Sequence, residues 1–403
     1  MAEGLTRRNF IGRVAALGCS AAASPLVTPA VFAAAPWDAR LVVIILRGAM
    51  DGLDVLRPVG DPSFAAMRGE LAGEAGPDLT GFHQLHPALA RLMPLWAAGQ
   101  LSFAQAVSTP YRDKRSHFDG QDLLEAGTPD LGGVRDGWLN RLLQVTSGVE
   151  AETAYAIGRE KMRILEGAAP TAEWSPEANL AMGQATLSLL NRVLSPDPLM
   201  AAAAAQAIEL SGIAEGVADF SQDEMMDSMA ASNDAVRRGN GHIKIAEFAA
   251  AKLAGDSRIA SFSIGGWDTH ANQARALVSP LEQLADTILT LQSGLGGVWE
   301  RTAVVAMTEF GRTARTNGSG GTDHGTGGAA LLAGGALRGG QVFGRWPGMA
   351  EADLYQRRDV MPTGDVRGVA GWIMRDLFGL ARGDIERVVF PGLQMGDNPG
   401  LIL

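Results

Sequence analysis

The chain has 403 residues, of which 46% are hydrophobic and 19% charged, a balance that supports a large core and excludes a disordered protein. Its formal net charge of −10 argues against a general nucleic-acid binder and against a protein that binds anionic membranes. A single cysteine, Cys19, excludes an intramolecular disulfide and a cysteine-rich zinc or iron–sulfur site.

The first 33 residues are typical of an export signal. An arginine pair at 7–8 precedes an apolar stretch rich in alanine and glycine, which ends in the small-residue sequence Val31-Phe32-Ala33. This order predicts a twin-arginine (Tat) signal peptide over residues 1–33, passage through the Tat machinery, and a periplasmic or extracellular mature protein. Prolines at 25 and 29 argue against a membrane span, and the alanine at position 16 argues against lipid attachment at Cys19.

Six apolar runs in the mature chain predict strands, at residues 41–46, 101–107, 154–158, 259–264, 302–307 and 329–333. The first is a continuous β-branched run, as in a parallel strand that is buried on both faces. Helical patterns lie between the runs, most clearly at 280–295. This alternation predicts an α/β fold with a doubly wound, mainly parallel sheet over residues 38–403. Residues 178–256 are rich in alanine and methionine and predict a helical insertion in that domain.

Polar residues follow several of these strands directly, at the edge of an open α/β sheet where ligands bind. Asp51 follows the first strand, Asp268 and His270 follow 259–264, and Glu309 and Arg312 follow 302–307. Carboxylates and imidazoles together suit zinc or another divalent ion. The alternatives are a turn aspartate at 51, a helix cap at 268, and a structural ion pair between Arg312 and Glu309.

Two further loops carry histidines. In the segment 114–122, Ser116 is either the N-cap of a helix, with Asp119 in the capping-box position, or a nucleophile at the start of that helix. His117 follows it directly. The glycine-rich loop 317–328 contains Asp323 and His324, and a histidine flanked by glycines is poorly explained as a core residue.

Together these segments resemble a bacterial family known as domain of unknown function 1501. The segments that carry the resemblance are the arginine-pair signal and the stretches RGAMDGLD, RSHFDGQD, GWLNRLL, GGWDTHANQ, TEFGRTARTNGSGGTDHG and GG.V.G..PG. They cover nearly the whole mature chain. Because the family has no characterised function, the resemblance implies a fold more than an activity.

That family in turn resembles the alkaline phosphatase and sulfatase superfamily, which implies an alkaline phosphatase-like fold with a metal site. By this resemblance, Asp51 matches the metal-binding aspartate after the first strand. Ser116 matches the nucleophile that opens a helix. Asp268 and His270 match an Asp…His pair, and His324 matches the final histidine of the metal site.

The chain also departs from the superfamily pattern. Glu309 takes the place of an aspartate that follows a later strand, and Phe310 stands where a second-metal histidine is usual. The Asp…His pair has a spacing of two rather than the usual four, and the Asp-His-Gly sequence at 323–325 offers a different alignment. These departures leave two possibilities open: one metal, or two unequal sites to which His117 or Asp119 contributes.

These observations predict an exported, metal-dependent hydrolase of phosphate or sulfate esters, which acts on a small molecule or an anionic polymer. Ser116 would attack and Arg312 would bind the anionic oxygens. One or two ions of zinc, manganese or calcium would be held by a set drawn from Asp51, Asp268, His270, Glu309 and His324, with His117, Asp119 and Asp323 as further candidates. The alternative is a non-catalytic exported binding protein that keeps the fold and a structural metal. A redox protein is disfavoured, since no Gly-x-Gly-x-x-Gly sequence joins a strand to a helix.

Overall fold

The computed structural model describes residues 37–403, apart from 113, 133–134, 147, 151–152, 158–161 and 175–240. The predicted signal at 1–33 and most of the predicted insertion at 178–256 therefore lie outside the described residues. The end of that insertion is helical, as predicted, and forms α10 (Gly241–Ala254). Among the described helices, none combines the length and the apolar character needed to cross a bilayer.

A nine-stranded sheet forms the centre of the described structure. Its order is β10-β4-β9-β8-β1-β7-β5-β6, with β11 also paired to β4. The strands are β1 (Arg40–Leu46), β4 (Leu101–Ser108), β5 (Ala154–Ile157), β6 (Ala172–Trp174), β7 (Ile259–Ile264), β8 (Thr302–Met307), β9 (Gly328–Ala333), β10 (Val342–Phe343) and β11 (Gly364–Asp365). A separate two-stranded ribbon joins β2 (Leu56–Arg57) and β3 (Gln84–Leu85). All six predicted strands are thus confirmed.

The direction of β9 determines which strand ends lie at the edge of the sheet that carries the predicted site residues. β1 pairs in parallel with β7 and β8, whereas β9 runs antiparallel to both β4 and β8. The carboxyl ends of β1, β4, β7 and β8 therefore share one edge with the amino end of β9. The prediction of a mainly parallel sheet is confirmed, and the reversed β9 is a feature that the sequence pattern did not predict.

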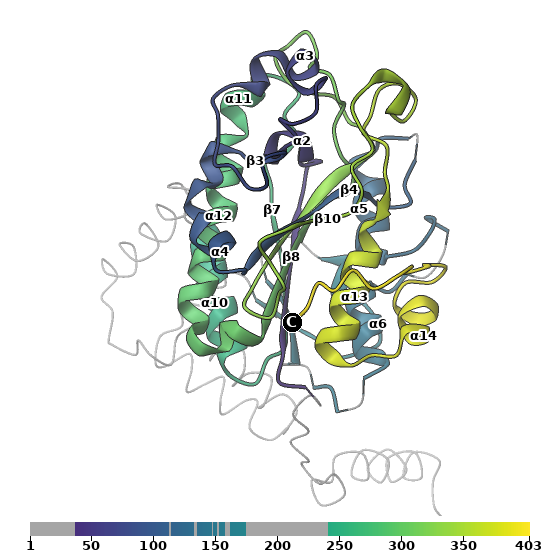
Figure 1. Cartoon of the computed structure of the whole chain (residues 1–403). Coiled ribbons are helices and arrows are strands. Elements are labelled where there is room, and N and C mark those ends of the chain that lie inside the picture. Colours follow the sequence, from purple (N-terminus) through teal and green to yellow (C-terminus); the bar gives the residue numbers. More distant parts are fainter. Residues whose placement is uncertain are drawn as a thin grey trace, which may run out of the picture. The chain divides into compact units, whose positions relative to one another are not determined.

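Helices cover both faces of the sheet (Figure 1). On one side lie α10 and α12 (Val278–Leu295), which contact β7. On the other side lie α6 (Trp138–Gln144) and α13 (Val366–Phe378). The remaining helices are α2 (Gly52–Val55), α3 (Phe64–Arg68), α4 (Met93–Ala97), α5 (His117–Ala126), α11 (Gln273–Ala276) and α14 (Arg382–Asp384), and short 3₁₀ or π turns connect several of them.

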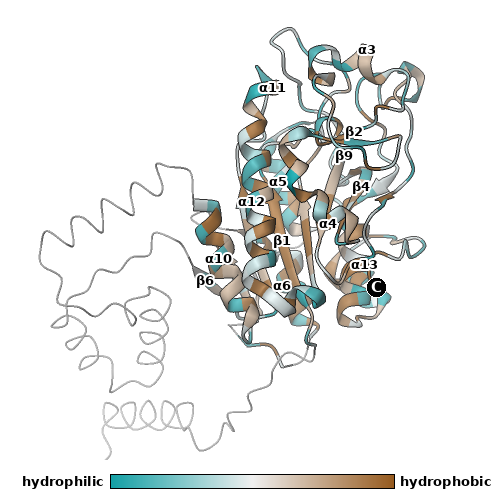
Figure 2. Ribbon diagram, turned by 60° about the vertical axis from the view of Figure 1, so that its left-hand side comes forward, coloured by the Kyte–Doolittle hydropathy of each residue, from teal (hydrophilic) through white to brown (hydrophobic). Residues whose placement is uncertain are grey.

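The apolar run of β1 is explained by these two layers. Leu41, Val43 and Ile45 pack in one core with residues of α6 and α13, and the alternate side chains of the strand are also fully buried. A strand covered on both faces has no solvent-facing row, so its sequence does not alternate. Figure 2 shows the same arrangement, with hydrophobic strands at the centre and hydrophilic residues on the outer helix faces.

Candidate metal centre

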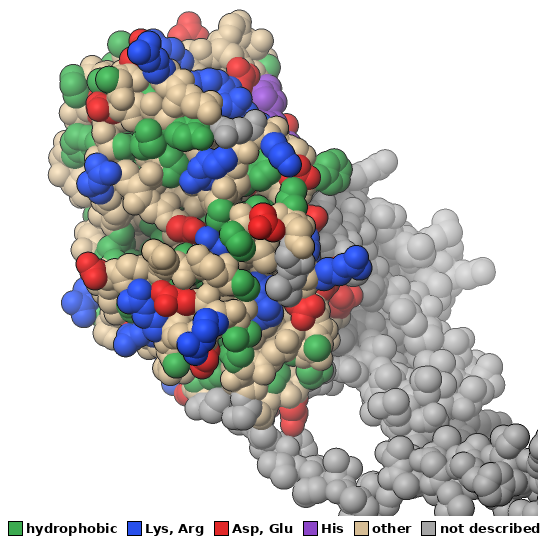
Figure 3. All heavy atoms as spheres, turned by 90° about the vertical axis from the view of Figure 1, so that its right-hand side faces the viewer, with side chains coloured by type: hydrophobic (Ala, Val, Ile, Leu, Met, Phe, Trp, Pro, Cys, Tyr) green, Lys and Arg blue, Asp and Glu red, His purple; other side chains and the backbone are tan. Residues whose placement is uncertain are grey.

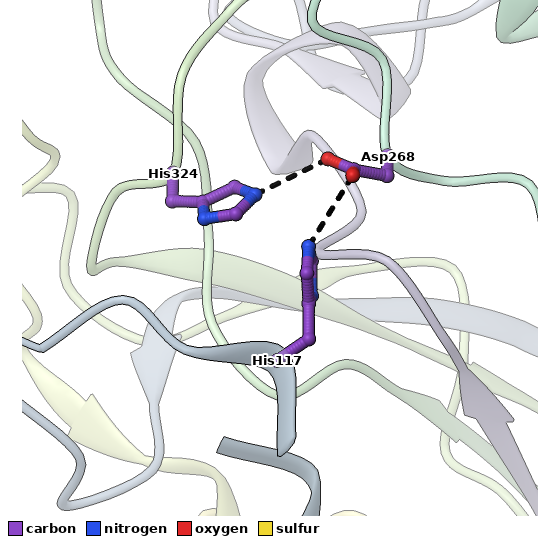
Figure 4. Close-up of side chains that lie close together, drawn as sticks. All are labelled: His117, Asp268 and His324. Atoms are coloured by element: carbon purple, nitrogen blue, oxygen red, sulfur yellow. Dashed lines mark hydrogen bonds and ion pairs between the residues drawn. The ribbon is translucent and has the colours of Figure 1, made fainter. Parts of the chain in front are cut away.

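Three predicted site residues from separate segments meet at the shared edge of the sheet. His117 opens α5 after β4, Asp268 follows β7, and His324 precedes β9. Each offers one ligand atom, and these atoms all lie within 4.8 Å of one another. Figure 4 shows both imidazole rings turned toward the Asp268 carboxylate. The three residues are called the metal-ligating cluster below.

Asp268 lies at the centre of this cluster. Its Oδ2 atom is 3.4 Å from His117 Nε2, and its Oδ1 atom is 3.2 Å from His324 Nε2. His270 lies beside the cluster, with its Nε2 atom 3.0 Å from Asp268 Oδ1 and 3.0 Å from His324 Nε2. Three imidazoles therefore present the same nitrogen, Nε2, to one carboxylate.

The opposite nitrogens of two of these rings establish their tautomers. Nδ1 of His117 lies 2.8 Å from Oε1 of Glu309, and Nδ1 of His324 lies 3.0 Å from the carbonyl oxygen of Arg115. A carbonyl or an ionised carboxylate can only accept, so each Nδ1 carries a proton, and in the neutral form of each ring Nε2 keeps its lone pair. This arrangement is typical of metal-binding histidines.

His270 has the same arrangement. Its Nδ1 atom is 3.4 Å from Oδ1 of Asp323, whose pKa is lowered by a hydrogen bond from Asn317 and by His270. The Nε2 atoms of His270 and His324 then face each other at 3.0 Å with both protons on the far side. Two nitrogen ligands of one tetrahedral zinc ion lie roughly 3.3 Å apart when each bond is about 2.0–2.1 Å.

These contacts fit a divalent cation. The Nε2 atom of His117 is buried and has no hydrogen-bond partner among the described residues. Nitrogen lone pairs and a carboxylate that point at one place repel one another unless a cation lies between them. Imidazole and carboxylate ligands suit zinc and related transition ions, so the residues present fit such an ion.

The pKa shifts of Asp268 and His324 agree with this role, whereas the raised pKa of His117 means that a metal must displace a proton from this ring. The hydrogen bond to Glu309 raises the pKa of His117, whereas burial lowers the pKa of His324. Burial by itself would raise the pKa of Asp268, but the hydrogen bond and the positive charge of Arg312 outweigh it and hold this pKa below its usual range. Asp268 is therefore an ionised carboxylate at neutral pH, as metal ligation requires.

Glu309 lies behind His117 rather than in the cluster. It is fully buried, and its Oε1 atom accepts hydrogen bonds from the amides of Gly48 at 2.9 Å and Ala49 at 3.1 Å as well as from His117. Burial acts to raise the pKa of Glu309, but the hydrogen bond from His117, with those from Thr308 and Gly48, lowers it overall. The sequence predicts that Glu309 binds metal directly, whereas in the structure its Oε1 atom orients a histidine.

Asp51 is likewise buried away from the cluster. It caps α2 through the amide of Leu53 at 3.1 Å, forms an ion pair with the buried Arg68, and accepts a 2.6 Å hydrogen bond from Gln273 Nε2. The expected second group of metal ligands around Asp51 and Glu309 is therefore not assembled among the described residues, because each carboxylate already has buried partners.

The sequence predicts that Arg312 contacts the substrate, whereas the structure buries its side chain. Its side chain has no exposed surface and donates to the backbone carbonyls of Gly48, Ala49, Trp267 and Thr322 at 2.7–3.0 Å. It also donates to Asp268 Oδ1 at 2.6 Å. Arg312 thus joins three loops beneath the cluster and holds the central carboxylate.

Gln273 is a buried support that the sequence analysis did not identify. Its Nε2 donates to Asp51 at 2.6 Å and to Asp54 at 3.1 Å, and its Oε1 accepts from the hydroxyls of Thr269 at 2.9 Å and Thr322 at 2.7 Å. Thr269 lies between Asp268 and His270, so this carboxamide ties the β7 loop to the β1 loop. The only sequence feature that points to Gln273 is its position at the end of the GGWDTHANQ segment.

Ser116 caps α5, as one of its two interpretations predicts. Its Oγ accepts from the amide of Asp119 at 3.4 Å, and its own amide donates to the Tyr111 hydroxyl at 2.8 Å. The Asp119 carboxylate is not part of the cluster. The Phe310 ring stacks on His117 with centroids 5.3 Å apart, so an apolar side chain occupies the side of the cluster facing Tyr111.

The glycines of the loop 317–328 allow other loops to approach it closely. A Cβ atom on Gly321 would lie 2.4 Å from the carbonyl carbon of His270, and one on Gly325 would lie 2.4 Å from the carbonyl of Arg312. Neither position has room for a side chain. These glycines therefore let the His324 segment pack directly on the Asp268–His270 and Arg312 segments.

We expect Gly325→Ala to destabilise the protein by about 1–3 kcal/mol, because the added methyl group must displace the backbone of Arg312. Metal affinity should fall as well, since His324 is the adjacent residue. Gly318→Ala in the same loop is the matched control, because nothing lies within 4 Å of its added Cβ. Urea unfolding of both variants measures the effect, and equal stability of the two would contradict this explanation of the glycines.

Comparison with known proteins identifies a family and a distant likeness to solved structures. The family described as "Protein of unknown function (DUF1501)" matches residues 92–371. Among solved structures, the lipoteichoic acid synthase LtaP from Listeria monocytogenes matches with a TM-score of 0.37 and 8% identity, over 92% of this chain and 76% of that chain. No curated protein sequence matches the chain.

Proposed function

We infer that this chain, which belongs to the DUF1501 family of proteins of unknown function, is an exported metal-dependent hydrolase of phosphate or sulfate esters. The observation that carries the proposal is the convergence of three Nε2 atoms on the Asp268 carboxylate, at the sheet edge where open α/β folds bind ligands. Export rests on the arginine-pair segment at residues 7–8.

The cluster favours a single transition ion. His117, Asp268 and His324 supply its ligands and His270 a fourth, while the buried pairs of Asp51 and Glu309 leave no second group of ligands among the residues that the structure describes. Histidine-rich ligation favours zinc over calcium, which prefers oxygen ligands. Such an ion, when bound, polarises an ester oxygen and lowers the pKa of an attacking hydroxyl or water.

The chain's own residues then have separate tasks. Ser116 is the nucleophile candidate, because it adjoins His117 at the amino end of α5. Glu309 and the Arg115 carbonyl hold the protons on Nδ1 of His117 and His324. Arg312 keeps Asp268 ionised and in place.

Elemental analysis of the exported protein, purified without chelators or a histidine tag, tests the metal site first. We expect about one equivalent of zinc or manganese, lost in His324→Ala, and turnover of at least one substrate in a panel of phosphate and sulfate esters. If the wild-type protein binds no metal on titration, the proposal fails. If it binds metal and an anionic ligand but turns over no ester, the protein is instead a binding protein that keeps a structural metal.

Two variants of Ser116 separate its capping role from chemistry. Ser116→Asn keeps an N-cap acceptor and removes the hydroxyl, whereas Ser116→Ala removes both and should cost about 1 kcal/mol of stability. If Ser116 is the nucleophile, kcat in both variants falls on the order of a thousandfold or more with metal content unchanged. Full activity of Ser116→Asn in steady-state assays would transfer the nucleophilic role to water.

A further inference from the structure

Two arginines beside the metal-ligating cluster share one buried aspartate. Asp359 has no exposed surface and accepts a hydrogen bond from the Thr326 hydroxyl at 2.9 Å. Nη1 of Arg358 lies 2.9 Å from Asp359 Oδ1, and Nη2 of Arg115 lies 3.6 Å from Oδ2. Both guanidinium groups are thus brought to one point by the same carboxylate.

This point lies next to the cluster. Thr313 forms a bridge with Asp359, and the preceding residue, Arg312, forms a bridge with His324. The His324, Arg312 and Asp359 segments therefore run side by side. Arg115 also contacts the cluster directly, because its carbonyl accepts the Nδ1 proton of His324. Its φ of 55° lies in the left-handed region, a strained conformation that is typical of functional sites.

The two arginines have more donors than Asp359 can use. The 3.6 Å approach of Arg115 is longer than a hydrogen bond, and its buried Nε has no hydrogen-bond partner among the described residues. Arg358 reaches the carboxylate through one amino group. The two side chains are 32% and 34% exposed, so a ligand can reach them. Asp359 faces both guanidinium groups, and Arg358 also lies near enough to Asp323 to lower the pKa of that carboxylate.

An anion is the ligand that this pair suits. The chain as a whole carries a net charge of −10, yet Lys114 and Arg357, which precede Arg115 and Arg358 in the sequence, are also exposed. Figure 3 shows Lys and Arg side chains gathered at the upper end of one face, beside a histidine. Guanidinium groups bind the oxygens of phosphate and sulfate through parallel hydrogen bonds. Arg312 cannot supply this contact, because it is fully buried.

We propose that Arg115 and Arg358, held by Asp359, form the anion subsite that binds a phosphate or sulfate group of the substrate next to the metal. The proposal rests on the proposed function for the identity of that substrate. The anion is either the reacting group itself or a neighbouring group on a polyanionic chain, and the two sources share the same oxyanion chemistry.

Calorimetric titration of the metal-loaded protein with inorganic phosphate tests the subsite. We expect Arg115→Gln and Arg358→Gln each to raise the Kd about tenfold, since each removes charge-assisted hydrogen bonds. Arg358→Lys, which keeps a charge against Asp359 and so preserves folding, should weaken binding less than Arg358→Gln. Arg357→Gln is the matched control, because it removes an exposed charge from the adjacent position and leaves the ion pair between Arg358 and Asp359 in place.

The outcomes separate this proposal from the hydrolase proposal. If phosphate binding in the Arg115 and Arg358 variants falls no further than in Arg357→Gln, the subsite is wrong, whether or not the wild type hydrolyses esters. If binding depends on both arginines but no ester is turned over, the subsite stands and the hydrolase proposal fails. A parallel titration with tripolyphosphate identifies the source: equal losses for both probes indicate the reacting group, and a larger loss for tripolyphosphate indicates a neighbouring one.

Discussion

Asp268→Asn is expected to abolish metal binding and ester turnover while the protein stays folded. Asp268 is the single carboxylate that faces the Nε2 atoms of His117, His270 and His324. Asparagine has nearly the same shape and its oxygen can still accept from Arg312, so the loops keep their main support. The lost negative charge leaves the three imidazoles without a charged ligand beside them. Metal affinity should fall at least about 100-fold, because mutating residues that only hydrogen-bond to a metal ligand already lowers the affinity about 10–100-fold.

Asp323→Asn provides a graded control for this result. Asp323 contacts Nδ1 of His270 on the side away from the cluster, at 3.4 Å. We expect a smaller loss of affinity, about tenfold, in competition titrations with a chromogenic chelator. Stoichiometric metal in Asp268→Asn, with an affinity like that of the wild type, would show that the cluster is not the metal site.

Arg312→Met is expected to have the largest effect on stability. Four buried carbonyl oxygens, from residues 48, 49, 267 and 322, accept hydrogen bonds from this one guanidinium. Methionine fills part of the volume but donates nothing. The Trp267 carbonyl still accepts from the Thr269 amide at 3.0 Å, whereas the other three carbonyls lose the guanidinium as their partner, and each unsatisfied buried acceptor costs about 1–3 kcal/mol. We expect the free energy of unfolding of the metal-free protein to fall by at least about 3 kcal/mol in urea.

Arg315→Met is the matched control for this variant. Arg315 is exposed and lies three residues further along the same loop, so its replacement should change stability by no more than about 0.5 kcal/mol. If Arg312→Met lies within about 1 kcal/mol of the wild type, the three loops are held by other contacts. A metal-binding defect in a stable Arg312→Met protein would indicate that the arginine acts on Asp268 alone.

The sequence by itself determined the strands of the central sheet. The run at 41–46 and the five others correspond to β1, β4, β5, β7, β8 and β9. A strand buried on both faces must be apolar along its whole length, and this requirement is local, so it can be recognised without knowing the partner strands. The same local pattern places Asp268, His270 and His324 in loops at strand ends.

The tertiary structure decided which of these polar residues meet and what each contacts. β9 runs antiparallel to its neighbours, and only this direction brings His324 to the edge that holds His117 and Asp268. Asp51 and Glu309 follow their strands, as predicted. Asp51, however, forms an ion pair with Arg68, and Glu309 forms one with His117. Hydrophobic periodicity repeats within a few residues, whereas His117 and Glu309 are 192 positions apart in the sequence. Which polar side chains are buried, paired or left facing a ligand therefore depends on the folded backbone.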